Sequence, residues 1–389
     1  MANKRIYYAI QQVGFADFQA PGVYTEAHGV QSVGITTNFS LEQVFQLGEL
    51  AIYENIEEIP DVEVTLNKVL DGYPLLFHMA TQDEETTAPT LAGRSNSRTQ
   101  FAMSIFSDTL TSATGTPGTI MECSGMYVSS VSYTFPVDGN STEDVTLVGN
   151  DKIWSGDTRI VHPSTIVRRD ALSFDGKFDD TDLPLAKTGV QRRQDLLFGN
   201  GLHGMTPDTN GASTDPNISV LPREVYGVTS SGTNELAADG NFGAHVNNIT
   251  LSADFGREQI NELGRKGPYH RFVTFPVEVT CEVEVTSGSG DMISATEAGI
   301  LTTSSSPCSD SGNLYNGTIR LASCDDTRLY LGTKNKLASV NYTGGDAGGG
   351  NVSVSYTFTT FNDFTVLHSQ DPHESGSNWW TNRSLYLTG

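Results

Sequence analysis

The stretch of this chain that most resembles a chemical site is Gly199-Asn200-Gly201-Leu202-His203-Gly204, which has the glycine spacing of a dinucleotide-binding loop. Such a loop needs a strand before it and a long helix after it, because the helix N-terminus holds the pyrophosphate. Met205-Thr206-Pro207-Asp208 follows directly and does not favour an amphipathic helix. We therefore interpret the hexapeptide as a glycine-rich loop.

Two other groups contain residue types that bind metal ions. The cluster Asp175, Asp179, Asp180 and Asp182 does not have the spacing of a twelve-residue calcium loop. His368, Asp371, His373 and Glu374 lie in a polar C-terminal stretch, where a histidine is more often a surface residue than a ligand. There is no G-x-S-x-G motif and no Cys–His nucleophile pattern. We expect no enzyme activity, no cofactor and no metal.

The dominant feature is a long internal repeat, in which residues 31–68 resemble residues 247–285. The separation is far longer than the roughly 20–50-residue units of solenoids and propellers, so it indicates two tandem domains. We call these units the first and second repeats. A constant offset aligns Phe39 with Phe255, Leu47 with Leu263, Gly48 with Gly264, Tyr53 with Tyr269 and Pro60 with Pro276; one deletion later, Glu63-Val64-Thr65 aligns with Glu278-Val279-Thr280.

Each repeat is expected to form a strand, a short helix and a second strand. Residues 31–39 alternate like a half-buried strand. Ser40 and Gln43 have capping-box spacing, so a helix is predicted from Leu41 to a stop at Gly48, and again from Gly256 to Gly264. The strands that follow alternate Val with Glu.

Two hairpins are predicted at equivalent places in the two repeats. Residues 126–135 and 143–148 flank a turn at Asp138-Gly139-Asn140, and residues 336–342 and 352–358 flank a glycine-rich tip from Gly344 to Gly350. The expected domains are therefore residues 1–160 and 219–367, with a linker or insertion at 161–218 and a C-terminal tail at 368–389.

Composition favours a mainly β protein, because charged residues are only 18% of the chain while glycine, serine, threonine and valine are frequent. The net charge of -23 argues against a protein that binds nucleic acid by neutralising phosphates. The four cysteines are irregularly spaced, so neither a zinc site nor a disulfide framework is indicated. No stretch approaches the roughly 20 apolar residues of a membrane span. These features predict synthesis in a reducing cytoplasm.

With these blocks in place, the chain resembles the tail tube proteins of tailed bacteriophages. The resemblance rests on residues 39–81 and 130–151 in the first repeat and on residues 255–285 and 331–358 in the second. It implies two tandem β-sandwich or barrel domains, each with a short flanking helix and a long hairpin. It also implies stacked rings that form a hollow, acidic tube through which the genome passes.

The resemblance further implies partners and a location. A chain with two tube domains implies homotrimeric rings of pseudo-sixfold symmetry, with a hexameric ring as the alternative. The other expected partners are tail proteins such as tape measure, baseplate, terminator and sheath proteins, and DNA is expected only as non-specific passing cargo. The chain would be made in the host bacterial cytoplasm and reside in the virion tail.

Candidate residues follow from this reading. Acidic residues expected to face the lumen are Glu54, Glu57, Glu58, Asp61 and Glu63. Candidates for contacts between subunits or rings are Asp138, Gly139, Asn140, Gly344, Gly345, Asp346, Gly348, Gly349, Trp379 and Trp380.

Two alternatives remain open. One is another virion or surface structural protein, such as a capsid decoration protein or an adhesin with tandem β domains. The other is a carbohydrate-binding or hydrolytic virion protein that uses Trp379, Trp380 and a pair of carboxylates.

Overall fold

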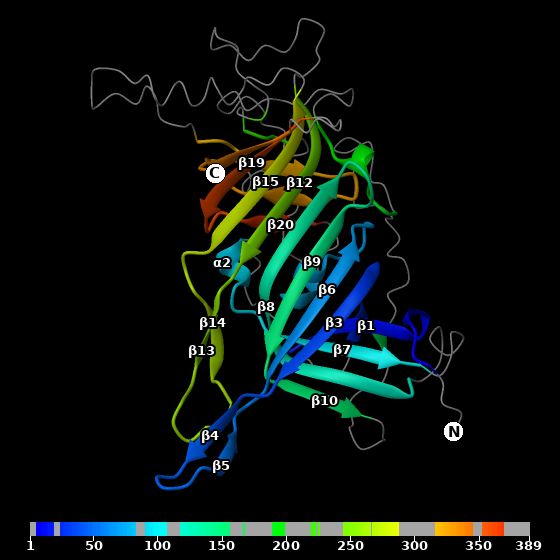
Figure 1. The fold of residues 1–389 in the computed structure, drawn as a ribbon. Helices are drawn as coiled ribbons and strands as arrows, with labels where there is room; N and C mark the ends of the chain where they lie inside the picture. The colour runs from blue at the N-terminus through cyan, green and yellow to red at the C-terminus, as the bar shows by residue number, and fades with distance from the viewer. Residues whose placement is uncertain are drawn as a thin grey trace, which may run out of the picture.

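The computed structural model is mainly β, as predicted, and is built from antiparallel sheets. It describes residues 5–18, 24–82, 90–106, 117–155, 166–167, 189–198, 219–222, 225, 244–265, 267–287, 316–344 and 352–368. Figure 1 shows one broad, twisted sheet running through the molecule, with smaller elements gathered behind it.

Two groups of four strands make up the broad sheet. The first repeat contributes strands in the order β3 (Val30–Asn38), β6 (Asp61–Val69), β9 (Thr142–Gly149) and β8 (Thr119–Pro136). The second contributes the order β12 (Ala244–Asp254), β15 (Glu278–Ser287), β19 (Ser353–Phe361) and β18 (Lys336–Thr343). Both groups connect their strands in the same sequence order, which is the structural counterpart of the repeat.

The two groups join through β8 and β12, which pair antiparallel with Tyr133 opposite Leu251. This pairing makes one continuous eight-stranded sheet. Its two outer strands, β3 and β18, each pair on one side within this sheet.

β-Bulges fix how the repeats align. A bulge at Gln31 in β3 recurs at Asn247 in β12, and a bulge at Ser129 in β8 recurs at Ala338 in β18. Bulges set strand register and bend, so their recurrence shows that the two sheets are built alike.

The register corrects one part of the sequence alignment. Val64 lies opposite Ile35 and Cys281 lies opposite Leu251, so Val64 corresponds to Cys281 rather than to Val279. An insertion, not a deletion, therefore separates the repeats here. A strand that alternates Val and Glu looks the same after a shift of two residues, which explains the error.

The predicted short helices are wrong, because both segments form β-hairpins. β4 (Leu41–Phe45) pairs with β5 (Ile52–Glu57), and β13 (Arg257–Ile260) pairs with β14 (His270–Val273) in the equivalent register. Gly48 and Gly264, expected to stop the helices, lie between the paired strands with φ of +97° and +85°.

The physical reason in the first repeat is that the core does not cover this segment. Leu41 and Phe45 are 58% and 61% exposed, so the helix that would have buried them has nothing to pack on. The backbone of Ser40 instead accepts a hydrogen bond from the Glu58 amide, which closes the base of the hairpin. Figure 1 shows both hairpins leaving the same end of the broad sheet.

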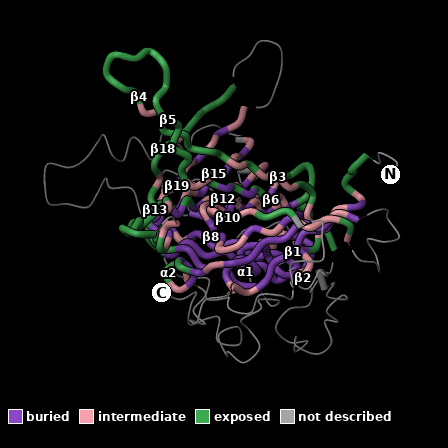
Figure 2. Tube along the Cα trace, turned by 90° about the horizontal axis from the view of Figure 1, so that it is seen from below, coloured by how far each residue is buried: buried purple, intermediate pink, exposed green. Residues whose placement is uncertain are grey.

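One apolar core lies against the inner side of the broad sheet and spans both repeats (Figure 2). In the first repeat it is covered by the short helix α1 (Leu76–Ala80) and by a second sheet that includes part of β8. The remaining elements of that sheet are β1 (Gln11–Asp17), β2 (Tyr24–Glu26), β7 (Thr99–Ile105), β10 (Asp151–Ser155) and β11 (Ile166–Val167), preceded by the 3-10 turn η1 (Tyr8–Ile10). The short helix α2 (Leu91–Arg94) lies against the second repeat, where the Leu91 amide bonds to Phe364.

A small sheet covers the core of the second repeat. It contains β16 (Arg320–Ala322), β17 (Arg328–Tyr330) and β20 (Thr365–Leu367). Residues 189–198, within the predicted linker and including the 3-10 turn η2 (Arg193–Asp195), connect the two halves. The Gln191 amide bonds to Leu70 of the first repeat, and the Leu197 amide bonds to Ala322 of the second. The proposed domain boundaries remain predictions.

Candidate functional site

The outer side of the broad sheet is polar and acidic. Along β6 and β15, valine, leucine and cysteine face the core, while the alternate positions carry glutamate, threonine and asparagine. The same alternation continues through β9, β12 and β19, where the outer positions are mainly serine, threonine or acidic residues. Strand geometry therefore places these side chains together on one surface.

We define the acidic sheet face as this outer surface of the eight strands. Lys336, at the start of β18, is the one basic residue that the described parts of these strands place on it. Cross-strand hydrogen bonds order parts of the face, including the one from Asn67 Nδ2 to Asp144 Oδ1, 2.7 Å long. Its acidic members are Glu63, Asp144, Asp254, Glu278, Glu282 and Glu284.

The predicted lumen residues divide between this face and the neighbouring hairpin. Glu63 lies on the acidic sheet face, and Asp61 lies at its end, where the Arg271 guanidinium binds it at 2.6 Å. Glu54 and Glu57 lie on the projecting strand β5, and Glu58 follows it. All five side chains are exposed, but the structure does not bring them together as one set.

Most of the acidic face was missed by sequence reasoning. The alternation of Glu and Val near residues 278–285 was a usable signal, because period two puts every glutamate on one side. Asp144 and Asp254 carried no such signal, since neither is part of an alternation of acidic and apolar residues.

The two edges of the broad sheet differ from the internal junction that they resemble. Tyr133 in β8 is fully buried, whereas its equivalent Tyr342 in β18 is 57% exposed. Phe255, which follows β12, is 1% exposed, whereas its equivalent Phe39 is 71% exposed. Side chains that are covered where the two repeats meet are thus uncovered where the sheet ends.

The other predicted interface residues lie at strand ends. Asp138, Gly139 and Asn140 form the exposed turn between β8 and β9, and Gly344 is exposed just after β18. Gly345, Asp346, Gly348, Gly349, Trp379 and Trp380 lie outside the described residues, as do the GxGxxG hexapeptide and the aspartate cluster.

A buried polar cluster links the broad sheet to α1. Glu143 accepts hydrogen bonds from the amides of Leu76 and Phe77, at 2.7 and 3.0 Å, and from the Tyr133 hydroxyl at 3.0 Å. Burial raises the pKa of the Glu143 carboxyl to about 6, although these hydrogen bonds oppose the shift. The cluster holds the start of α1 against β9.

A neighbouring ion pair neutralises a buried lysine. Lys68 is completely buried and donates to Asp71, which also bonds His28 at 2.8 Å. Burial alone would raise the pKa of the Asp71 carboxyl, but the His28 hydrogen bond and the Lys68 charge outweigh it and lower that pKa. Both the ion pair and the Glu143 cluster have structural partners throughout, which favours a structural role.

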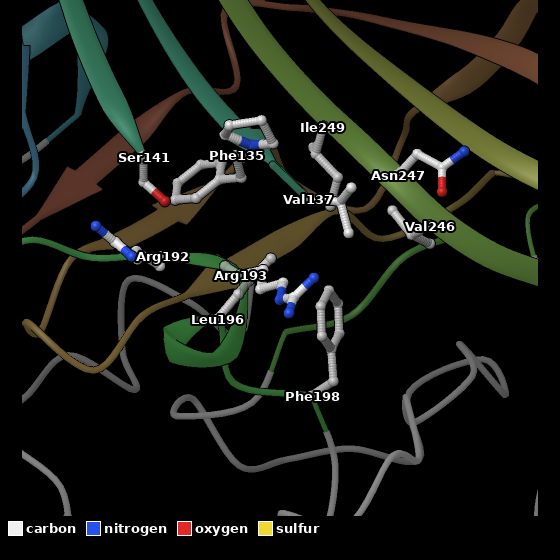
Figure 3. A pocket seen from close by; sticks show the side chains of 11 residues that line it. Phe135, Val137, Ser141, Arg192, Arg193, Leu196, Phe198, Val246, Asn247 and Ile249 are labelled. Atoms are coloured by element: carbon white, nitrogen blue, oxygen red, sulfur yellow. The ribbon is translucent and has the colours of Figure 1, made fainter. Parts of the chain in front are cut away.

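A groove of about 230 Å³ lies at the end of the β8–β12 junction (Figure 3). Phe135, Val137 and Ile249 come from the sheet side, and Leu196 and Phe198 come from the connecting segment. Arg192 and Arg193 supply its charged groups, and none of the described residues that line it is a carboxylate. It therefore offers neither an acid–base pair nor a set of metal ligands.

The described residues contain no group of three or more histidine, cysteine or acidic side chains that would hold a metal ion. Among those same residues, no helix is long and apolar enough to span a membrane.

The sequence matches no protein-family model and no curated protein. The tube-terminating cap of the anti-feeding prophage is a similar solved structure, with 12% identity, a TM-score of 0.30, and 40% of this chain and 95% of that chain covered. The sheath–tube complex of an extracellular contractile injection system has 13% identity, a TM-score of 0.28 and the same coverage. The native gene transfer agent virion has 9% identity, a TM-score of 0.26, and 38% and 95% coverage.

Proposed function

We propose that this chain is a tail tube protein, a structural virion component whose copies close into rings that stack as a hollow tube. Three chains form each ring, since each chain supplies two sheet units, and the pseudo-sixfold ring then contains six. The tube's other partners are tail proteins such as tape measure, baseplate, terminator and sheath proteins. The chain is made in the host bacterial cytoplasm.

The observation that carries the proposal is the internal β8–β12 junction. Across the sheet, that junction pairs β8, at one edge of the first group of four strands, with β12, at the facing edge of the second group. The strands left at the two outer edges are β18, the counterpart of β8, and β3, the counterpart of β12. The same pairing between chains would repeat the junction and remove both edges, which otherwise invite uncontrolled association.

The register of the junction extends to the contact between chains. Tyr133 opposite Leu251 corresponds to Tyr342 opposite Ile35 of the neighbouring chain. The side chain of Phe39 would become covered like that of Phe255. Each large side chain removed from water in this way contributes roughly 1.5–3 kcal/mol.

The acidic sheet face then lines the bore. A surface of serine, threonine and carboxylates offers no cations to the phosphate backbone, so double-stranded DNA passes as cargo without being held. The core and the covering elements lie on the opposite side of the sheet from the acidic sheet face, away from the bore (Figure 2).

Substituting Tyr342→Asp tests ring closure. The side chain is 57% exposed in the single chain, so the fold is expected to survive with a loss below about 1 kcal/mol. At the interface the new carboxylate would be buried without a partner. We expect tubes of the parent protein but single chains of the variant, by analytical ultracentrifugation and negative-stain microscopy.

Asn341→Asp is the matched control. Asn341 is the adjacent exposed residue of β18, but it lies on the acidic sheet face, where one more carboxylate faces water. Tubes should form normally. Normal assembly of Tyr342→Asp, or equal loss in both variants, would contradict closure through β18 and β3.

A further inference from the structure

From the contacts of hairpin β13–β14 within the chain, we propose that hairpin β4–β5 clasps the neighbouring chain of the same ring, with an ion pair between Glu54 and the neighbour's Lys336. This inference rests on the proposed ring and adds a second contact to the edge-to-edge pairing of strands.

Within one chain, hairpin β13–β14 of the second repeat binds the first repeat beside the internal junction. Gln259 and Arg271 both donate to the Asp61 carboxylate, at 3.1 and 2.6 Å. The ring of His270 meets the ring of Tyr127 edge-on, with centroids 5.0 Å apart. The hairpin therefore acts as a clasp between one repeat and the next.

Hairpin β4–β5 has the same strand register but makes no equivalent described contacts within its own chain. Gln43 lies opposite Asn55 as Gln259 lies opposite Arg271. Its exposed strands carry no described contact with the rest of their own chain beyond the hairpin base. Figure 2 shows it standing away from the buried core.

The repeat identifies what the hairpin would meet on a neighbour. Asp61 corresponds to Glu278, so the repeat places the polar side chains of Gln43 and Asn55 opposite the carboxylate of the neighbour's Glu278. His270 corresponds to Glu54, and Tyr127 corresponds to Lys336. The aromatic pair of the internal clasp is thus replaced by an acid and a base.

The charge distribution makes this replacement specific. Lys336 is the basic residue noted on the otherwise acidic sheet face, and its side chain is exposed in the single chain. Glu54 is also exposed, so both charged groups are accessible to a neighbouring chain. Two independent hydrogen-bond donors facing one carboxylate, together with an acid facing a base, point to a second copy of this chain as the occupant.

A charge exchange tests the clasp through the critical concentration for tube assembly, measured by pelleting and electron microscopy. Lys336→Glu and Glu54→Lys should each raise that concentration about tenfold at low salt, since each creates a like-charge contact worth about 1.4 kcal/mol. The double variant should return to within about twofold of the parent, because the pair is restored in reverse.

Lys334→Glu is the control, since Lys334 is an exposed lysine two residues before Lys336 and outside the sheet. We expect it to change the critical concentration less than twofold. Tubes that form normally in both single variants, or a double variant no better than the worse single one, would overturn the clasp and leave the ring intact. A parent chain that forms no tubes would overturn the ring as well.

Discussion

Glu143 shows how a charged residue is used inside this sheet. It lies opposite Lys68, and the equivalent pair in the second repeat is Val354 opposite Val285. The sheet itself therefore does not need charge at this place. The carboxylate is explained by α1, whose first amides it accepts.

The raised pKa of Glu143 predicts a pH-dependent contribution to stability. The folded pKa of about 6 exceeds the ordinary value of 4.5, so the folded chain binds this proton more tightly than the unfolded chain. The contribution is complete below pH 4.5 and is lost as the pH rises through about 6. The difference of about 1.5 pKa units corresponds to about 2 kcal/mol.

Glu143→Gln isolates this contribution, because glutamine does not titrate. The chain with Glu143 and the Glu143→Gln variant both carry Tyr342→Asp, which is expected to keep them as single chains. Urea unfolding of the two is compared between about pH 4 and pH 7. The stability of the parent minus that of the glutamine variant should fall by about 2 kcal/mol as the pH rises. A difference that stays constant would contradict the assigned pKa.

At the residue scale, alternation in the sequence predicted the strand faces correctly. Val64 faces the core and Glu63 faces outward, as the pattern of the second strand implies. Spacing could not reveal Asp144 and Asp254 as members of the acidic face, since only the pairing of β9, β8 and β12 brings them onto one surface.

At the scale of elements, the hairpins were both the clearest success and the clearest failure of sequence reasoning. Strands β9, β18 and β19 are confirmed near their expected bounds, because polar turns separate alternating strands. Strand β8 ends where expected but begins at Thr119, seven residues before the predicted start. The segment from Leu41 to Phe45 has helix-like spacing but forms a strand. Local spacing favoured the helix, whereas pairing with β5 and the lack of a nearby core decided the structure.

The exposed hairpin β4–β5 is the element that a single chain leaves unexplained. Leu47 and Leu50 at its tip are fully exposed, and exposed apolar surface of this kind marks interaction sites. In the proposed ring its strands bind the adjacent chain, while the tip extends beyond the end of the sheet. The long repeat in the sequence made this comparison possible, although the hairpin itself was not predicted.

At the scale of the whole molecule, the duplication would let one chain supply two adjacent positions of the proposed ring. The sequence predicted the duplication, but not that β8 and β12 merge the repeats into one sheet over one core. That junction needs contacts between strands more than 100 residues apart, which no local pattern encodes.

The acidic sheet face gives a prediction for the assembled tube. Replacing Glu282→Lys and Glu284→Lys together should make tubes bind double-stranded DNA at about 50 mM salt, with affinity falling steeply at higher salt, whereas parent tubes should not bind. Asp151→Lys with Asp363→Lys adds equal charge at exposed sites away from this face. Equal DNA retention by both variants would contradict a bore lined by the acidic face.

The most direct test of the central claim is cryo-electron microscopy of assemblies of the full-length chain at a resolution that traces strands. We predict threefold rings with six similar lobes, in which β18 of each chain pairs with β3 of the next and the acidic sheet face lines a continuous bore. Single particles without a bore at all protein and salt concentrations would contradict the account, as would tubes whose bore is lined by another surface.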